Sequence, residues 1–336
     1  MGRLILYLKQ LKNFMKTTTP KKIIVTGGYG FIGSRFVQQV LQNTSYNVKI
    51  IDKMTYAADK SRVHPSGESH FRLEHSKIDI CDVDANMLRG AHYIVNFAAE
   101  SHVDNSIKDG KPFIKSNVEG VLNLLDCAKD LKYLKKFVQI STDEVYGDMY
   151  DLRGRQSADE SFSIRPSSYY SASKASADLL VQSAARTHGI PYLITRSCNN
   201  FGPNQHPEKL LPLLFECIKE GKEVPIYGKG FQSREWIHVD DNVEIILELM
   251  FSRARNEVYN IGSGYHYKNI EIVNFVGHLL GEKVKYKYVK DRLGHDKAYR
   301  LDTSKVGSFL GTKIYQTLEG FLKDEVKRIT GSSNRR

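Results

Sequence analysis

A glycine-rich turn directly after a short β-branched run is the feature that most constrains the fold of this chain. Residues 22–26 have the pattern of a buried strand, and Gly28, Gly30 and Gly33 follow it with the GxGxxG spacing. Glycine at these positions permits a tight strand-to-helix turn, close approach of the backbone to a pyrophosphate and close packing of helix on strand. The N-terminus of the following helix then offers N–H groups to phosphate oxygens. The turn therefore predicts a dinucleotide-binding site.

An acidic residue at the end of the second predicted strand supports this interpretation. Residues 48–52 form that strand, and Asp52 lies 19 residues beyond Gly33. A carboxylate at this place can bind both hydroxyls of an adenine ribose and repels a 2′-phosphate. The sequence therefore favours NAD over NADP. The adjacent Lys53 weakens that preference without reversing it.

Short β-branched runs continue to alternate with segments that have helical spacing of apolar residues. Continuous apolar strands separated by helices are typical of a parallel sheet that is covered on both faces. The sequence therefore predicts an α/β fold with a Rossmann-type, doubly wound parallel sheet. The further predicted strands are 71–79, 93–98, 137–142 and 192–197, and the predicted helices are 31–41, 113–129 and 170–187.

The regular alternation of predicted strands and helices ends after about residue 200, where proline and glycine cluster in a loop-rich region. We expect a smaller, mixed α/β C-terminal lobe on the carboxyl side of the strands, where an open sheet holds its ligand. Residues 236–250 and 258–262 look regular enough to return to the first domain. The predicted organisation is a basic extension (1–21), a dinucleotide-binding domain (22–200 with about 235–263), a substrate lobe (201–234 and 264–326) and a basic tail (327–336).

The net charge of +11 is concentrated at the two ends of the chain. Residues 1–22 carry six basic and no acidic residues, and residues 327–336 carry four basic and no acidic ones. The body between them is nearly neutral, which argues against a nucleic-acid groove. The N-terminal segment has some amphipathic spacing, which is compatible with a mobile extension, a surface-seeking helix or a targeting leader.

Membrane insertion and a disulfide framework are both disfavoured. No apolar run approaches about 20 residues, the length that spans a bilayer. The four cysteines, Cys81, Cys127, Cys198 and Cys217, are scattered without a CxxC pair, which is typical of reduced thiols in the cytoplasm. We therefore expect a cytoplasmic protein with no metal site and no membrane or nucleic-acid partner.

A tyrosine and a lysine are spaced to act together in the segment YSASK. Tyr170 and Lys174 are four residues apart on a predicted helix, so their side chains share one face. An ammonium close to a phenol lowers the pKa of the phenol toward neutrality, and the phenolate can then take a proton from a sugar hydroxyl. The same lysine can bind a nicotinamide ribose. We expect Tyr170 to act as a base.

Three functional groups lie at the carboxyl end of the fifth predicted strand. Thr142, Asp143 and Glu144 end that strand, and the carboxyl ends of parallel strands face the ligand crevice. The alternative is a solvated turn, but two adjacent carboxyls beside a hydroxyl contribute little to packing. If they are functional, unequal environments can make one an acid and the other a base. That role requires one carboxyl to be protonated near neutrality and the other ionised.

These residues, taken together, resemble the extended short-chain dehydrogenase/reductase family. Within it the chain is similar to the nucleoside-diphosphate-glucose 4,6-dehydratases, the dTDP-glucose enzymes in particular. The acidic pair is the specific part, because related epimerases and decarboxylases generally lack it. The matching stretches span most of residues 22–305 in the family's order and are TGGYGFIGS, IDKMTYA, DICD, FAAESHVD, STDEVYGD, YSASKASAD, NNFGPNQHPEKL, SREWIHVDD, YNIGS and DRLGHD.

The resemblance implies an internal redox cycle that uses NAD as a retained cofactor. Tyr170, helped by Thr142, would deprotonate the C4 hydroxyl of the sugar while hydride leaves C4. Glu144 would then remove the C5 proton, and Asp143 would protonate the departing C6 hydroxyl. Return of hydride to C6 gives a 4-keto-6-deoxy sugar nucleotide and water. The alternatives are a nucleotide-sugar epimerase or decarboxylase on the same scaffold, and a non-catalytic NAD-sensing protein.

The resemblance also implies the remaining site residues and the assembly. A homodimer would form through a four-helix bundle of residues 113–129 and 170–187, and the lobe would bind a nucleotide sugar. Asn105 and Leu293 depart from the family pattern near the substrate. The choice between thymine and uracil as the base of the substrate is therefore left open. The implied NAD site comprises Gly27, Gly28, Gly30, Phe31, Ile32, Gly33, Asp52, Lys53, Thr55, Asp79, Ile80, Ala98, Ala99, Tyr170 and Lys174. The implied substrate site comprises Ser101, His102, Asn199, Lys209, Leu210, Pro225, Tyr227, Arg234, Asn269, Arg292 and His295.

Overall fold

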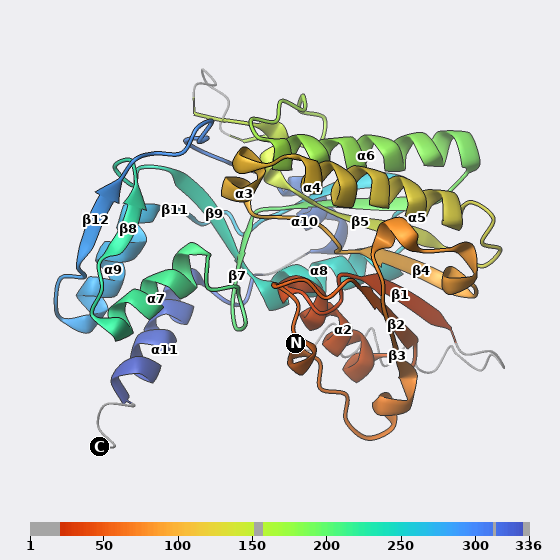
Figure 1. The fold of residues 1–336 in the computed structure, drawn as a ribbon, viewed down its shortest axis with the longest axis horizontal. Coiled ribbons are helices and arrows are strands. Elements are labelled where there is room, and N and C mark those ends of the chain that lie inside the picture. The colour runs from red at the N-terminus through yellow and green to blue at the C-terminus, as the bar shows by residue number, and fades with distance from the viewer. Residues whose placement is uncertain (1–20, 151–156, 312–313, 332–336) are drawn as a thin grey trace.

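The computed structural model describes residues 21–150, 157–311 and 314–331. Residues 1–20 of the predicted N-terminal extension and residues 332–336 of the predicted C-terminal tail lie outside these ranges. Within them, no helix is both long enough and apolar enough to cross a membrane. The chain forms a large sheet covered by helices and a smaller lobe beside it (Figure 1).

The large sheet has seven strands, and every pairing within it is parallel. This confirms the predicted fold class. Its central strands are apolar and almost completely buried, as expected for a sheet with helices on both faces. In spatial order the strands are β10 (Glu257–Ile261), β6 (Tyr192–Ser197), β5 (Lys136–Thr142), β4 (Ala91–Asn96), β1 (Lys22–Thr26), β2 (Asn47–Asp52) and β3 (Leu73–Lys77).

Two helical layers cover this sheet (Figure 1). One contains α2 (Phe31–Asn43) and α8 (Val239–Phe251), which contact each other and share one apolar core with the sheet. The other contains α5 (Gly120–Ala128) and α6 (Tyr169–His188), which pack on the opposite face around a second core. The remaining helices of this part are α3 (Val103–Lys108), α4 (Lys111–Ile114) and α10 (Ser304–Leu310).

Two predicted elements differ from the observed ones. The strand predicted at 71–79 is shorter because Gly67–Arg72 forms a 3-10 helix, in which the side chains of Ser66 and Ser69 bond each other's backbone. The helix predicted at 113–129 is interrupted by a π-helical segment, Lys115–Glu119, between α4 and α5. The other short 3-10 helices are Lys60–Arg62, Ile80–Asp82, Ala85–Leu88 and Asp143–Tyr146.

The smaller lobe is built on two short sheets and has its own apolar core. One sheet contains β8 (Val224–Tyr227) and β12 (Tyr286–Val289), and the other contains β7 (Asn199–Phe201), β9 (Ser233–His238) and β11 (His266–Lys268). Its helices are α7 (Leu210–Glu220), α9 (Asn269–Leu280) and α11 (Leu318–Gly331). Because α8 and β10 follow β9 and belong to the large sheet's half of the molecule, the chain enters the lobe, leaves it and returns.

A buried lysine ties the start of β5 to the end of α8. The ammonium of Lys136 donates to the carbonyl oxygens of Leu249, Met250 and Ser252 at 3.0, 2.9 and 2.8 Å. These carbonyls lie at the C-terminus of α8, where helix geometry leaves them without intrahelical donors and a positive charge is favourable. Lys136 therefore fixes the strand that leads into the Thr142–Glu144 segment.

We expect Lys136→Met to lower the free energy of unfolding by about 3 kcal/mol, because it leaves three carbonyls at a helix end without their charged donor. The neighbouring Lys135 is exposed, so Lys135→Met is the matched control and should change stability by less than about 0.5 kcal/mol. Denaturant-induced unfolding of the three proteins measures the difference. Equal losses for both variants would contradict this role of Lys136.

Candidate active site

A pocket of about 470 Å³ lies between the large sheet and the lobe. Its walls include the turn after β1, the loops after β4 and β5, and lobe residues from β8, β9 and the loop after β12. The pocket is therefore at the carboxyl ends of the parallel strands, where open α/β sheets bind ligands. A smaller pocket of about 90 Å³ adjoins it and shares residues of the glycine turn.

The predicted site residues gather in these two pockets. Those lining the larger pocket are Gly27, Gly30, Phe31, Ile32, Gly33, Thr55, Ala99, Ser101, His102, Thr142, Glu144, Tyr170, Lys174, Asn199, Lys209, Leu210, Pro225, Tyr227, Arg234, Asn269, Arg292 and His295. The smaller pocket adds Asp52, Lys53, Asp79, Ile80 and Ala98. Gly28 and Asp143 line neither pocket.

The glycine turn has no room for side chains. Gly27 has a φ of +64°, and a Cβ there would lie 2.6 Å from the amide nitrogen of Ala98. A Cβ on Gly33 would lie 2.3 Å from the carbonyl oxygen of Gly27, and one on Gly28 would lie 2.9 Å from Ile50. The turn leads into α2, whose first N–H groups have no partner within the helix. Its shape and free donors fit a bound pyrophosphate.

Asp52 lies at the end of β2 in the smaller pocket. Its two oxygens accept hydrogen bonds from the backbone N–H groups of Tyr29 at 3.0 Å and Met54 at 2.8 Å. These bonds fix the carboxylate, and each oxygen keeps a second lone pair for a ribose hydroxyl. The position of Asp52 beside the glycine turn fits the adenosine half of NAD.

The charge of Lys53 is balanced by its neighbours. Its ammonium lies 3.1 Å from a carboxylate oxygen of Glu100 and 2.9 Å from the hydroxyl of Ser116. A second carboxylate, that of Asp79, lies 3.9 Å away. The prediction that Lys53 weakens the preference against a 2′-phosphate required an uncompensated ammonium. The structure instead adds negative charge from Glu100 and Asp79 to that of Asp52.

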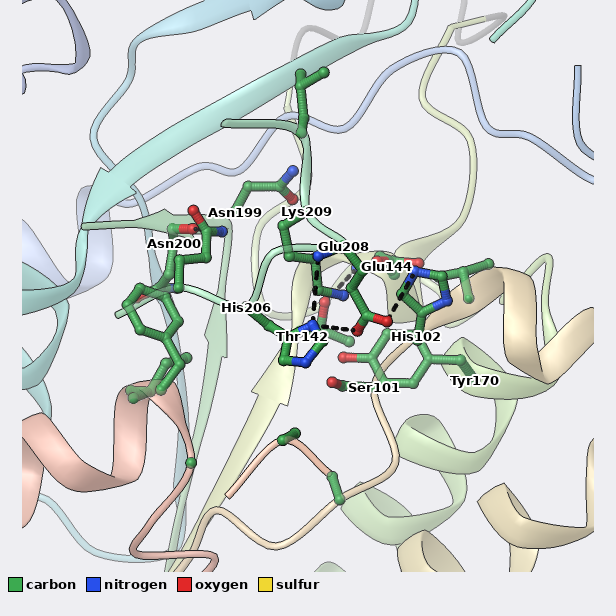
Figure 2. A pocket seen from close by; sticks show the side chains of 18 of the residues that line it. Ser101, His102, Thr142, Glu144, Tyr170, Asn199, Asn200, His206, Glu208 and Lys209 are labelled. Atoms are coloured by element: carbon green, nitrogen blue, oxygen red, sulfur yellow. Dashed lines mark hydrogen bonds and ion pairs between the residues drawn. The ribbon is translucent and has the colours of Figure 1, made fainter. Parts of the chain in front are cut away.

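A tight turn at the end of β5 separates the two adjacent acids. The hydroxyl of Thr142 accepts a hydrogen bond from the N–H of Glu144 at 3.3 Å and donates to Asp143 at 3.1 Å, which caps the 3-10 helix Asp143–Tyr146. The next residue, Gly147, has a φ of +74°, and a Cβ there would lie 2.0 Å from the carbonyl oxygen of Arg165. As a result Glu144 lines the pocket with Thr142 (Figure 2), whereas Asp143 is 2% exposed and lines neither pocket.

The two acids have different electrostatic surroundings. Burial, together with the charges of Glu144 and Glu235, raises the pKa of Asp143 well above its usual range. Burial also raises the pKa of Glu144, but Arg292, Arg234 and Lys209 oppose that shift. Both pKa values are raised, that of Asp143 further than that of Glu144, so Asp143 is the acid that keeps its proton to higher pH, which is the order that the expected division requires.

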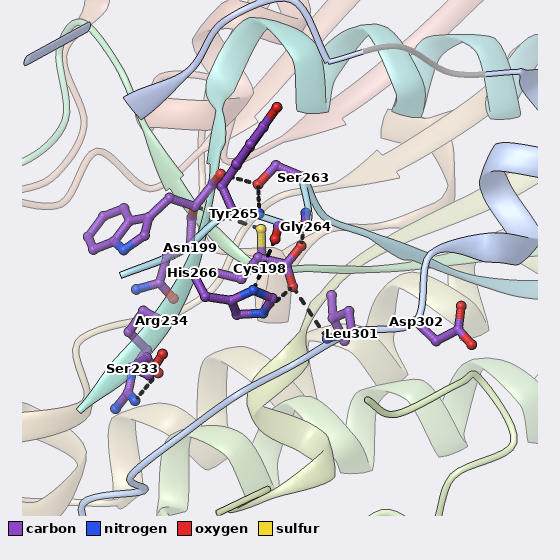
Figure 3. Close-up of polar contacts among 12 residues, drawn as sticks. Cys198, Asn199, Ser233, Arg234, Ser263, Gly264, Tyr265, His266, Leu301 and Asp302 are labelled. Atoms are coloured by element: carbon purple, nitrogen blue, oxygen red, sulfur yellow. Dashed lines mark hydrogen bonds and ion pairs between the residues drawn. The ribbon is translucent and has the colours of Figure 1, made fainter. Parts of the chain in front are cut away.

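Glu235 is a buried acid that the sequence analysis did not single out. It lies on β9 with no exposed surface and accepts hydrogen bonds from the N–H groups of Gly264 at 2.7 Å and Leu301 at 3.3 Å. The imidazole of His266 lies 3.4 Å from the same carboxylate (Figure 3). Glu235 lies within the quoted stretch SREWIHVDD, in which only Arg234 was predicted as a site residue. Glu235 supplies negative charge behind Asp143 and so favours its protonated form.

Tyr170 and Lys174 lie on α6, which begins with a capping box between Ser168 and Ser171. Burial raises the pKa of Tyr170, and the charges of Glu144 and Asp143 raise it further, while a hydrogen bond with Thr142 opposes them. The ammonium of Lys174 donates to the carbonyl oxygen of Ile140 at 2.5 Å, and burial lowers its pKa to about 8. Lys174 is thus bound to a backbone oxygen, and its effect on the pKa of Tyr170 stays a prediction.

The lobe side of the pocket is rich in cations. Arg234 is buried, stacks on Tyr299 with its guanidinium carbon 4.4 Å from the ring centre, and donates to the carbonyl oxygen of Asp296 at 2.9 Å. Arg292 and Lys209 line the same wall. Burial and the charge of Arg292 lower the pKa of His295 to about 4, so this imidazole is neutral at neutral pH. The wall suits a diphosphate, which arginines bind with paired N–H donors.

A carboxylate lies between two imidazoles in the lining of the larger pocket (Figure 2). The oxygens of Glu208 lie 3.6 Å from Nε2 of His102 and 3.5 Å from Nδ1 of His206. Burial, with the charge of Lys209, lowers the pKa of His102. Glu208 and His206 lie in the quoted stretch NNFGPNQHPEKL, in which only Asn199, Lys209 and Leu210 were predicted as site residues. No cluster of three or more metal-binding side chains occurs in the described part of the chain.

Comparison with known proteins places this architecture in a family. Residues 23–262 match the model of the NAD dependent epimerase/dehydratase family. The chain is 43% identical to the low-salt glycan biosynthesis protein Agl12 of Haloferax volcanii, and the match covers 84% of this chain and 90% of that protein. It is 39% identical to dTDP-glucose 4,6-dehydratase 1 of Escherichia coli, with 91% and 92% covered.

A solved structure shows the same likeness in three dimensions. The dTDP-glucose 4,6-dehydratase DesIV of Streptomyces venezuelae, solved with NAD bound, superposes with a TM-score of 0.85 at 38% identity. The match covers 93% of this chain and 98% of that one. The resemblance that the sequence motifs indicated is thus confirmed by sequence identity, coverage and fold. The chain belongs to the NAD dependent epimerase/dehydratase family.

Proposed function

We propose that this protein is an NAD-dependent hydro-lyase that converts a nucleoside-diphosphate-glucose into the 4-keto-6-deoxy sugar nucleotide and water. One observation carries the proposal: the turn after β5 presents Thr142 and Glu144 to the pocket beside Tyr170, with Asp143 buried behind them in conditions that keep it protonated. The likeness to proteins named dTDP-glucose 4,6-dehydratase supports it.

The residues of both pockets suit NAD. The glycine turn and the first turn of α2 would hold its pyrophosphate, Asp52 its adenine ribose, and Lys174 its nicotinamide ribose. When bound, NAD supplies a hydride acceptor that gives the hydride back within the same turnover. The chain's own groups then move only protons, and each of them needs a defined protonation state.

Tyr170 takes the proton of the C4 hydroxyl as C4 becomes a ketone, and the hydroxyl of Thr142 polarises the same oxygen. The ketone makes the C5 proton acidic, and Glu144, held as a carboxylate by the surrounding cations, removes it. Asp143 gives its proton to the C6 hydroxyl, which leaves as water. Glu144 returns its proton to C5 once C6 has been reduced, so the sugar loses one water overall. Tyr170 then holds one proton more and Asp143 one fewer than at the start, and a proton passes from Tyr170 to Asp143, directly or through solvent, before the next turnover.

Asp143 needs a side-chain movement for this role. Its Oδ1 accepts a hydrogen bond from Thr142, and its Oδ2 is buried and has no hydrogen-bond partner among the described residues. Because the side chain does not line the pocket, we infer that it turns about its Cα–Cβ bond to reach the C6 hydroxyl. The raised pKa keeps the acid protonated until it does so.

The preferred base is proposed from the relatives. Two of those compared are named for dTDP-glucose, so dTDP-glucose is the first substrate to test. Thymine and uracil differ by one methyl group, which a well-fitted apolar pocket distinguishes by about 1–3 kcal/mol. UDP-glucose is therefore the second. An epimerase of the same family would keep the C6 oxygen and would need neither Asp143 nor Glu144.

We also propose a homodimer through the outer surfaces of α4, α5 and α6. These elements lie side by side on one face of the sheet (Figure 1). They expose large apolar side chains, with Ile114 43%, Leu122 47% and Leu179 55% exposed. Paired helices from two copies would bury them in a four-helix bundle. Sedimentation at twice the chain mass of 38.3 kDa supports this assembly, and sedimentation at that mass contradicts it.

The substrate test is conversion without added cofactor. The purified protein is incubated with dTDP-glucose and, separately, with UDP-glucose, and the 4-keto-6-deoxy product is detected by its absorbance in alkali. We expect product from dTDP-glucose without added NAD, because the redox cycle regenerates the bound cofactor. Formation of product from neither sugar nucleotide, in protein shown to contain NAD, would refute the proposed function.

The acid and base roles are tested by Asp143→Asn combined with Glu144→Gln. We expect oxidation at C4 to persist, so that NADH accumulates on the enzyme and is seen by its absorbance, while product formation falls by about 10²-fold or more. Two exposed acids that line neither pocket, Asp130 and Glu223, provide the matched control Asp130→Asn with Glu223→Gln. Unchanged turnover in the first double variant would rule out these roles.

A further inference from the structure

Asp104 joins the large sheet's half of the molecule to the lobe across the pocket. It lies in the first turn of α3, which follows β4. Its Oδ2 accepts a hydrogen bond at 2.9 Å from the hydroxyl of Tyr227, which ends β8. Its Oδ1 lies 3.6 Å from Nη1 of Arg292, in the loop after β12. All three side chains line the larger pocket.

The pairing of Asp104 with Arg292 is a single contact to one nitrogen of the guanidinium. At 3.6 Å the contact is an ion pair rather than a hydrogen bond. Among the described residues, Nε of Arg292 and Oδ1 of Asp104 are both buried without a hydrogen-bond partner. The two side chains are 20% and 24% exposed. A partly exposed, single-point ion pair of this kind contributes little free energy and can exchange.

The other acids near Arg292 are engaged elsewhere. Glu208 faces the imidazoles of His102 and His206. Asp291 accepts hydrogen bonds from the backbone N–H of Arg292 at 2.9 Å and from the side chain of Gln232 at 2.9 Å, and it contacts His295 at 2.6 Å, so it shapes the loop. Glu144 also faces the charge of Arg292, but among the described carboxylates only that of Asp104 lies within 4.0 Å of its guanidinium nitrogens.

We infer that the carboxylate of Asp104 binds Arg292 and Tyr227 while the pocket is empty of substrate, and that the substrate's diphosphate replaces this carboxylate when the nucleotide sugar enters. The inference rests on the proposed function, which assigns a diphosphate to the cationic wall formed by Arg292, Arg234 and Lys209. Phosphate offers the guanidinium two oxygens and more charge than one carboxylate oxygen does, so the exchange favours the ligand. Asp104 thereby delays binding of ligands that cannot displace it.

The exchange and a purely structural role of Asp104 predict opposite changes in the affinity for a diphosphate. If Asp104 competes with phosphate, removal of its charge strengthens diphosphate binding. If Asp104 only positions Arg292 and Tyr227 for the ligand, the same change weakens binding. Asp104→Asn separates the two cases, because its amide oxygen can still accept the hydrogen bond from Tyr227 while the charge on Arg292's partner is lost.

The test is calorimetric titration of the full-length protein with dTDP, which binds without reacting. We expect the Kd of Asp104→Asn to be about threefold to tenfold lower than that of the wild type. Asp109→Asn is the matched control, since it removes the same charge from the exposed residue that ends α3 and does not line the pocket. Its Kd should equal that of the wild type.

A double-mutant cycle locates the effect on one side chain. In an Arg292→Gln background, Asp104→Asn should no longer strengthen dTDP binding, because the cation for which the two anions compete is gone. The KM of Asp104→Asn for dTDP-glucose should fall by the same factor as its Kd for dTDP. Melting temperatures show that each variant is folded.

The outcomes separate this inference from the proposed function. An unchanged or weaker Kd in Asp104→Asn, an equal gain in the Arg292→Gln background, or no dTDP binding by the wild type would each overturn it. A wild-type protein that binds dTDP with these variant effects, yet forms no 4-keto-6-deoxy product, would instead refute the dehydratase function alone.

Discussion

The capped turn at the end of β5 is the constraint on which the rest of the site depends. The hydroxyl of Thr142 bonds both to its neighbour's side chain and to the backbone of Glu144, and Gly147 closes the turn where a side chain would collide. The strand itself is buried along its whole length. Lys136 anchors its start to α8, and Lys174 bonds the carbonyl of Ile140 near its end. The backbone of the turn is therefore held in one conformation, which leaves rotation of the side chains as the movement open to the two acids.

This geometry explains how two consecutive carboxyls acquire different properties. Asp143 is buried and lines neither pocket, and burial with the charges of Glu144 and Glu235 raises its pKa, so its proton is retained. Glu144 points toward Arg234, Arg292 and Lys209, which favour its ionised form. The same cations attract a diphosphate. Under the proposed function, the cations that bind the substrate's diphosphate are therefore also those that favour the ionised form of the base.

Local features of the chain were predictable from its sequence. The glycine turn, the carboxylate at the end of β2 and the Tyr170–Lys174 spacing depend on neighbours within a few residues, and the structure places all of them at the carboxyl edge of the sheet. Contacts between distant segments were not predictable. Lys53 is neutralised by Glu100, 47 residues away, and Lys174 turns to a backbone oxygen instead of the phenol. Asp104 meets Tyr227 across 123 residues of chain, and no local pattern specifies that contact.

The central claim is that one hydrogen moves within the sugar while Glu144 exchanges a proton at C5. Isotope tracing measures both events at once. Substrate carrying deuterium at C4 is converted in ordinary water and unlabelled substrate in D₂O, and the products are analysed by NMR. The account predicts that the C4 deuterium appears at C6, and that a solvent deuteron appears at C5. Loss of the C4 label to water, or its return to C4 with the C6 oxygen retained, would contradict it.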